Sequence, residues 1–316
     1  MDFTFKGWQT TPMKKMLGYK PIGVWATKLL VVFSVIAATS STAAEPESPA
    51  AALMERHSAL SGNLAKNQFA RPLFLESSET ANSVSGNAYA ILDSPFATVK
   101  STFENPGKWC DVMILHLNTK FCRALSGANP ARLKVNIGKK TPQELKDAFA
   151  LEFTHELVQK SSGSPPYLEV HLKAEKGPLG TSDYRIELSA VPLTDGKTFM
   201  HLKYSYGYGF AGRIAMQTYL ATLGSQKAGF TRLSGDSKPK YVGGMRGVVE
   251  RNTMRYFLAI EAYLASLSQP QADQFNARLE RWFDATEQFP DQFHDIDRDS
   301  YLNMKKQEIQ RQQSAS

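Results

Sequence analysis

Three glycines in the stretch YSYGYGFAG, residues 204–212, have the G-x-G-x-x-G spacing of a dinucleotide-binding turn. That turn requires a parallel βαβ unit and an acidic residue about 20 positions later. Here the strand ends an antiparallel series, and the chain near that offset reads SQKAGF, without an acid. We therefore reject nucleotide binding. The alternation instead places Tyr204, Tyr206 and Tyr208 on one face of a strand, either in an ordinary aromatic core or in the wall of a site for an amphipathic ligand.

Two further patterns approach a metal site, and neither completes one. His155 and Glu156 begin the H-E-x-x-H motif of zinc proteases, but Gln159 stands where the second histidine ligand is needed. The run DIDRDS, residues 295–300, spaces three aspartates like the first ligands of a calcium loop, but Lys306 stands at the position of the closing glutamate. We interpret this run as a solvated acidic helix start. The sequence therefore predicts no metal and no cofactor.

The first 44 residues have the organisation of a secretory signal peptide. Basic residues, among them Lys14, Lys15, Lys20 and Lys28, precede the short apolar run LLVVFSVIAA, and the small-residue segment TSSTAA then ends at Ala44. An uncleaved inner-membrane anchor is the alternative, because IGVWAT lengthens the apolar run across one lysine. We predict an exported, periplasmic protein, which associates with the inner membrane if this segment is retained. Cleavage would remove five of the 37 basic and one of the 30 acidic residues, which lowers the net charge from +7 to +3 and argues against nucleic-acid binding.

The chain contains two cysteines, Cys110 and Cys122, in the segment WCDVMILHLNTKFC. An exported compartment is oxidising, which favours a disulfide between them. Such a bridge would contribute about 3 kcal/mol in the chain-entropy model. Two buried thiols are the alternative, because the sequence does not test the geometry that a disulfide needs.

The rest of the chain divides into three parts by composition. Residues 45–85 are rich in polar and small residues and predict a linker with one short helix at 50–60. Residues 86–270 form the predicted folded domain, and residues 271–316 form a polar helical extension that ends in the solvated tail KKQEIQRQQSAS. Period-two alternation and turn residues predict antiparallel strands at 86–92, 132–138, 150–159, 167–174, 183–191 and 198–208. Helices are predicted at 95–103, 109–116, 210–223 and 247–267.

This order of elements resembles the helix-grip fold of the START-like (SRPBCC) superfamily. The specific stretches are GNAYAILDSPFATVKSTFENPGKWCDV, at the first strand and helix pair, and GVVERNTMRYFLAIEAYLASL, the closing helix. The helix at 210–223 departs from the simplest version of that fold. The resemblance implies an α+β domain in which a curved antiparallel sheet wraps around a long C-terminal helix. It also implies a deep cavity between the two, which in many members holds a lipid or another apolar ligand, and it implies no catalytic motif.

The closing helix carries charged residues on a surface that is otherwise apolar almost all round. Some of these charges, Arg251 and Arg255 among them, must therefore face inward, and buried charges need partners. They form either internal ion pairs, with Asp183 or Glu187 as candidate partners, or an arginine cluster that holds a lipid headgroup or a carboxylate.

These observations predict a non-enzymatic exported protein that binds a hydrophobic or amphipathic, lipid-like molecule in the cavity. The residues expected to contact this ligand are Tyr184, Tyr204, Tyr206, Arg251, Arg255 and Tyr256. One alternative is a cavity enzyme of the cyclase or hydrolase type, with His116, His155 and Glu250 as acid–base candidates. Another is a structural envelope protein whose cavity is filled by side chains, and whose basic helix at 301–313 meets a partner or a membrane surface.

Overall fold

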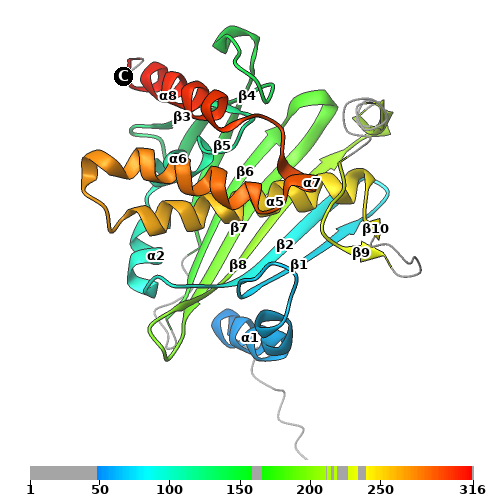
Figure 1. The fold of residues 1–316 in the computed structure, drawn as a ribbon, viewed down its shortest axis with the longest axis vertical. Coiled ribbons are helices and arrows are strands. Elements are labelled where there is room, and N and C mark those ends of the chain that lie inside the picture. The colour runs from blue at the N-terminus through cyan, green and yellow to red at the C-terminus, as the bar shows by residue number, and fades with distance from the viewer. Residues whose placement is uncertain are drawn as a thin grey trace, which may run out of the picture. The chain divides into compact units, whose positions relative to one another are not determined.

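The computed structural model of the chain describes residues 48–158, 166–210, 212–214, 217–218, 227–233 and 240–314. Within the folded unit, Pro46–Ser316, the main element is an eight-stranded antiparallel sheet with the order β1-β2-β8-β7-β6-β5-β4-β3 (Figure 1). The strands are β1 Leu73–Glu79, β2 Ser83–Leu92, β3 Thr119–Leu125, β4 Ala131–Ile137, β5 Phe149–Leu157, β6 Leu168–Lys176, β7 Thr181–Pro192 and β8 Thr198–Tyr208. Two short strands, β9 Arg232–Leu233 and β10 Lys240–Tyr241, pair separately.

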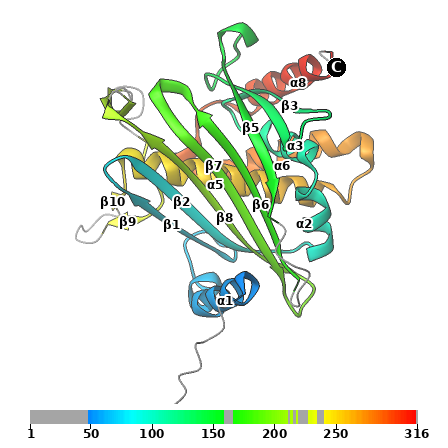
Figure 2. The same ribbon diagram turned by 180° about the vertical axis from the view of Figure 1, so that it is seen from behind.

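A long helix, α5 at Gly244–Ser266, lies across one face of the sheet, which Figure 2 shows from the opposite side. Strand β8 presents alternate residues to this face, and from Met200 to Tyr208 these are its buried ones. At Gly86 on β2 a Cβ atom would collide with the side chain of Thr253, so glycine permits the close approach of α5. A second helix, α6 at Gln271–Glu287, packs along α5. The sheet and α6 together explain why the apolar residues of α5 nearly encircle it.

The α+β helix-grip arrangement, a curved antiparallel sheet around a long helix, is confirmed. The six predicted strands form, and β3 is an additional strand that the sequence pattern did not indicate. Its first four residues are all buried, so it lacks the period-two alternation that marks a strand with one solvated face. The predicted helix at 210–223 falls mostly outside the described residues.

The predicted helix at 50–60 forms, but the rest of the described part of segment 45–85 belongs to the fold and is not a linker. Helix α1, Pro49–Ala65, begins after Ser48, whose Oγ accepts a hydrogen bond from the backbone N–H of Ala51 at 3.2 Å. Its apolar side packs on the face of the sheet opposite α5, against Val191 and Phe199. Strand β1 then pairs with β2 along its whole length. It is an edge strand with few buried residues, which gives it the composition of a linker.

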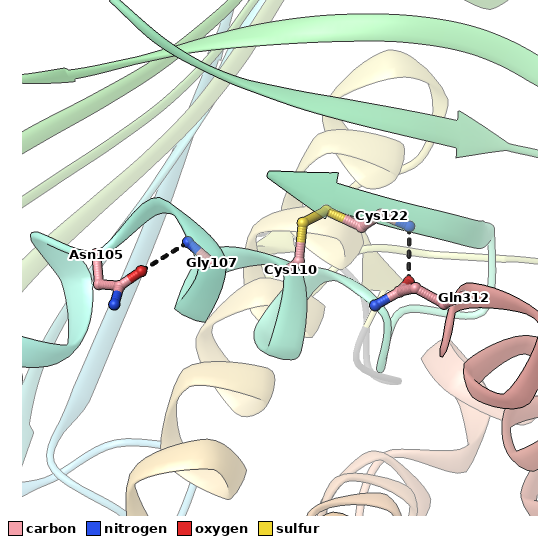
Figure 3. Close-up of a disulfide and its surroundings, with 5 residues drawn as sticks. All are labelled: Asn105, Gly107, Cys110, Cys122 and Gln312. Carbon is pink, nitrogen blue, oxygen red and sulfur yellow. Dashed lines mark hydrogen bonds between the residues drawn. A yellow bond between two sulfur atoms is a disulfide. The ribbon is translucent and has the colours of Figure 1, made fainter. Parts of the chain in front are cut away.

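The predicted disulfide between Cys110 and Cys122 is present (Figure 3). Helix α2, Phe96–Phe103, ends shortly before Asn105, whose Oδ1 accepts from the backbone N–H of Gly107 at 2.8 Å and so starts helix α3, Pro106–Met113. Cys110 on α3 faces Cys122 on β3, with 5.1 Å between their Cα atoms. The bridge fixes α3 against the sheet.

The C-terminal extension is helical, as predicted, but its last helix is not a solvated tail. A short helix, α7 at Pro290–Phe293, leads to α8 at Arg298–Ser314. On α8, Lys305 and Glu308 are buried against the start of β3. At the middle of β3, Gln312 Oε1 accepts from the backbone N–H of Cys122 at 2.9 Å (Figure 3). The buried residues of α8 include Lys305 and Glu308 as well as Tyr301 and Met304, which explains why its sequence suggested solvent.

The N-terminal segment at 1–44, which the sequence predicts to be a signal peptide or an anchor, lies outside the described residues. In the described part of the chain, no helix combines the length and the apolar character that a membrane span requires.

Candidate ligand-binding site

The four tyrosines predicted from the sequence come together between the sheet and α5. Tyr184 comes from β7, Tyr204 and Tyr206 from β8, and Tyr256 from α5, and all four side chains are buried. The ring centroids lie 5.2 Å apart for Tyr184 and Tyr206, and 5.4 Å apart for Tyr204 and Tyr256. The rings of Tyr204 and Tyr206 are 5.8 Å apart and complete the tyrosine cluster, the name used below for these four residues.

A β-bulge positions Tyr184 in this cluster. The register between β7 and β8 shifts between Ser182 and Arg185, and Asp183 has a positive φ of 53°. An extra residue of this kind bends a strand and redirects its side chains. After the bulge Ile186 lies opposite Tyr204, so both strands present their tyrosines to α5.

The hydroxyl groups of the cluster are polar groups in an apolar surrounding. Burial raises the pKa of each of the four phenols, so all of them are protonated at neutral pH. The Tyr184 hydroxyl lies 2.8 Å from Thr181 Oγ1. The Tyr206 hydroxyl is different, because it has no hydrogen-bond partner among the described residues. It is also shielded from water, since the residue is only 3% exposed. A buried hydroxyl without a partner costs about 1–3 kcal/mol, which a polar group of a ligand would offset.

The two predicted arginines of α5 adjoin the cluster and contact protein groups. Arg255 Nη2 lies 2.7 Å from Asp295 Oδ2, which is an internal ion pair of the kind predicted. Arg251 Nη1 donates to the carbonyl oxygens of Lys227 and Ala228, at 2.9 Å each. The charge of Arg251 also opposes the rise in the pKa of Tyr206, which places it near that ring.

The proposed partners Asp183 and Glu187 are wrong for these arginines. The Glu187 carboxylate pairs with Lys203 at 2.8 Å, and Asp183 lies 3.7 Å from Arg185. Glu187 alternates with the inward residues of β7, so it projects from the other face of the sheet. The actual partner of Arg255 comes from the connection between α7 and α8, far away in the sequence.

The three acid–base candidates each contact a different part of the fold. His155 Nε2 lies 3.1 Å from the carbonyl oxygen of Phe103 on α2. The Glu250 carboxylate accepts from the backbone N–H of Phe230 at 2.6 Å and from the hydroxyl of Ser77 at 2.6 Å. The His116 ring lies 5.2 Å from that of Tyr256. Only His116 therefore contacts the tyrosine cluster among these three.

A cavity of about 750 Å3 opens beside Tyr184, where β5 and β6 separate. The two strands pair from Thr154 to Leu157 of β5, whereas the earlier residues of β5 have no partner on β6. Leu151, Ala174 and Tyr184 contribute apolar surface to the cavity, and most of its other lining residues are charged. The expected deep cavity beneath α5 stays a prediction.

Sequence reasoning missed Lys140 and Lys227, which lie beside Arg255 and Asp295. Lys140 Nζ lies 2.8 Å and Lys227 Nζ 3.8 Å from Asp295 Oδ1. Asp295 is buried in this contact and is not part of a solvated helix start, whereas Asp297 caps α8 by accepting from Ser300 N at 2.9 Å. These residues come from separate loops, so no local spacing could indicate that they meet.

Comparisons with known proteins add to this description at the level of the fold. No protein-family model and no curated protein matches the chain. Among solved structures it is similar to human StAR-related lipid transfer protein 5, with 8% identity and a TM-score of 0.29 over 54% of this chain and 89% of that one. It is also similar to norcoclaurine synthase from Thalictrum flavum, with 11% identity and a TM-score of 0.31 over 47% and 91%. For Ara h 8.0201 the identity is 10% and the TM-score 0.33, over 61% and 99%. At such low scores the fold class rests on the strand order and α5 described above.

Proposed function

We propose that this is an exported, non-enzymatic protein that binds a hydrophobic or amphipathic, lipid-like molecule between the sheet and α5. The observation that carries the proposal is the tyrosine cluster, in which the buried Tyr206 hydroxyl has no partner among the described residues. Apolar surface of the ligand would be removed from water against the rings, which contributes about 25 cal/mol per Å2. The hydroxyl would orient a polar group of the ligand.

Export is the part of the proposal that the disulfide supports, since such bridges persist in oxidising compartments. The N-terminal sequence pattern predicts either cleavage near Ala44 or retention as an inner-membrane anchor. Fractionation of producing cells, with N-terminal sequencing of the purified protein, tests both. Recovery of the unprocessed chain from the cytosol with free thiols would contradict export.

The separation of His116, His155 and Glu250 supports binding over catalysis, because a general acid–base mechanism needs its groups within reach of one substrate. The ring contacts of 5.2–5.8 Å also suit the structural alternative, in which side chains fill the interior and the protein has an interaction role in the envelope.

Removal of a single oxygen atom distinguishes ligand binding from the structural alternative. Tyr206→Phe removes the unpartnered hydroxyl and keeps the ring, so the fold should keep or slightly gain stability. If a ligand binds there, its affinity should fall several-fold, measured on the ligand that native mass spectrometry or solvent extraction finds in the purified protein. Tyr167→Phe on the other face, whose hydroxyl donates to Glu169 at 3.1 Å, is the matched control. Purified protein that carries no ligand and takes up no apolar probe such as N-phenyl-naphthylamine would refute the proposal.

A further inference from the structure

Three positively charged side chains from three separate segments meet one carboxylate. Arg255 of α5 contacts Asp295 Oδ2 at 2.7 Å, while Lys140 and Lys227 approach Oδ1 at 2.8 and 3.8 Å. We call these four residues the Asp295 cluster. Three cations thus approach the one carboxylate of Asp295.

The cluster is closed to water at one end and open at the other. The side chain of Arg255 is 3% exposed, whereas those of Lys140 and Lys227 are 25% and 24% exposed. Burial lowers the pKa of Lys140 to about 8, and repulsion from Arg255 adds to this although Asp295 opposes it. Arg255 and Arg251 both repel the charge of Lys140, so the potential around Lys140 is positive although Asp295 lies beside it. An anion that enters from the lysine side would be attracted toward Arg255.

His116 connects this cluster to the tyrosines. Its Nδ1 accepts a hydrogen bond from the backbone N–H of Asn118 at 3.1 Å, so the proton of the neutral ring is on Nε2. Nε2 is buried and has no hydrogen-bond partner within the described residues. Burial, followed by the charge of Arg255, holds the pKa of His116 well below its ordinary value, so the ring stays neutral. A buried N–H donor therefore lies near Arg255, against the ring of Tyr256 and close to the side chain of Asn252.

We propose that Lys140, Lys227 and Arg255 bind the acidic end group, a carboxylate or a phosphate, of the ligand whose body lies in the tyrosine cluster. His116 Nε2 donates a hydrogen bond to the same group, and Asp295 takes its place when no ligand is bound. This inference rests on the proposed function. Charge-assisted hydrogen bonds of this kind are stronger than neutral ones and fix orientation, so the ligand would be an anionic amphiphile rather than a neutral lipid.

Three probes with one chain and different end groups test this: dodecanoate, dodecyl phosphate and dodecanol. Their binding to the purified full-length exported protein is measured by displacement of N-phenyl-naphthylamine and by calorimetry. The proposal expects at least one of the two anions to bind about tenfold more tightly than dodecanol, which corresponds to about 1.4 kcal/mol. The anion that binds more tightly identifies whether the site prefers a carboxylate or a phosphate.

The double variant Lys140→Gln, Lys227→Gln should abolish this preference by lowering the affinity for the anions to that for dodecanol. Lys139→Gln combined with Lys146→Gln is the matched control, because both lysines are exposed and the net charge changes equally. Loss of the preference in the control as well would show that the attraction is general, and would overturn the assignment of the site.

Asp295→Asn is a second, independent test, since it removes the internal competitor. It should tighten the binding of the preferred anion several-fold and leave dodecanol unaffected, and weaker anion binding would refute the role given to Asp295. If the three probes bind equally to the unchanged protein, the proposal that the site binds an acidic end group is wrong, while the proposed function stands. If neither the probes nor the naphthylamine binds, the proposed function fails, and this inference fails with it.

Discussion

Two lysine-rich clusters attach the C-terminal segment to the rest of the fold, and they differ in their access to water. In the Glu308 cluster, Lys120 of β3 and Lys305 of α8 share the carboxylate of Glu308, at 3.0 and 2.8 Å. The exposed fractions of these side chains are 0%, 0% and 2%. In the Asp295 cluster the lysines are about a quarter exposed. Each cluster thus has more than one cation around one carboxylate, but only the Glu308 cluster excludes water.

The hydrogen bonds of the two clusters differ in the same way. Each ammonium group of the Glu308 cluster donates to two backbone carbonyl oxygens as well as to Glu308. An ammonium group has three donors, so both lysines are saturated. Burial of these charges is tolerated because every donor has an acceptor. The comparison indicates that the buried and fully hydrogen-bonded charges of the Glu308 cluster fix α8 to the fold. The partly exposed Asp295 cluster, in contrast, can still accept an anion from solvent.

Among substitutions in the two clusters, Glu308→Gln should have the largest effect on stability. It leaves two fully buried lysines without a counterion, and removal of one partner of a buried pair costs about 3–5 kcal/mol. Urea denaturation followed by circular dichroism measures the loss. Glu280→Gln, on an exposed position of α6, is the matched control and should change stability by less than about 0.5 kcal/mol. Equal stability of both variants would show that the Glu308 cluster does not hold α8.

Alkaline pH should stabilise the protein through the same cluster. Burial lowers the pKa of Lys305 from 10.5 to about 8. Below pH 8 the folded state must keep this charge buried, and that cost is relieved as the pH rises from 8 toward 10.5, because the unfolded state then binds more protons. Between pH 7 and 9.5 we expect a gain of about 2 kcal/mol for one such lysine.

Urea denaturation at several pH values measures this gain. The pH range of the measurement must end below pH 10. Above it the buried tyrosines, whose pKa values are raised, make the folded state retain protons and lower the stability. The pKa of Lys140 is also lowered to about 8, but its side chain reaches water. Lys305→Gln should therefore reduce the increase in stability with pH more than Lys140→Gln does. A larger effect of Lys140→Gln would mean that Lys140, and not Lys305, is the lysine whose charge is costly to bury.

Asp295→Asn should destabilise the ligand-free protein by roughly 1 kcal/mol, less than Glu308→Gln. The amide oxygen can still accept from Arg255, and both lysines can turn toward water. Thermal unfolding measures the change, with Asp147→Asn at an exposed position as the control. A loss as large as that of Glu308→Gln would mean that Asp295 is a structural partner, and would weaken its assignment as the group that a ligand replaces.

The sequence predicts those features that depend on local periodicity. The alternation in residues 204–208 places Tyr204 and Tyr206 on the inner face of β8, and the structure confirms it. The prediction for Tyr184 also holds despite the bulge at Asp183. The bulge lies before Tyr184, so Tyr184 and Ile186 follow the same alternation of buried residues. The edge strand β1 and the fully buried start of β3 have no such alternation, and they were missed for that reason.

Both charge clusters were beyond sequence reasoning for a different physical reason. Lys120 and Lys305 are 185 positions apart in the sequence, and a polar helix such as α8 ordinarily faces water. Asp295 stood out only for a calcium-loop spacing that the structure shows to be irrelevant to its contacts. Charged residues carry no periodic signature when their partners come from other segments, so only the tertiary structure reveals them.

Lys140→Gln should have the smallest effect on stability, within about 0.5 kcal/mol of zero. The positive charge of Lys140 is repelled by Arg255 and Arg251, and this opposes the attraction of Asp295. Its removal also leaves the Arg255–Asp295 pair in place. Lys120→Gln is the informative counterpart, because it withdraws a saturated donor from Glu308 and from two carbonyl oxygens and should cost several times more. Urea denaturation of both variants compares the clusters directly. Equal losses would mean that Lys140 contributes as much to stability as Lys120, whereas a near-zero change for Lys140→Gln is the result expected if its charge serves binding.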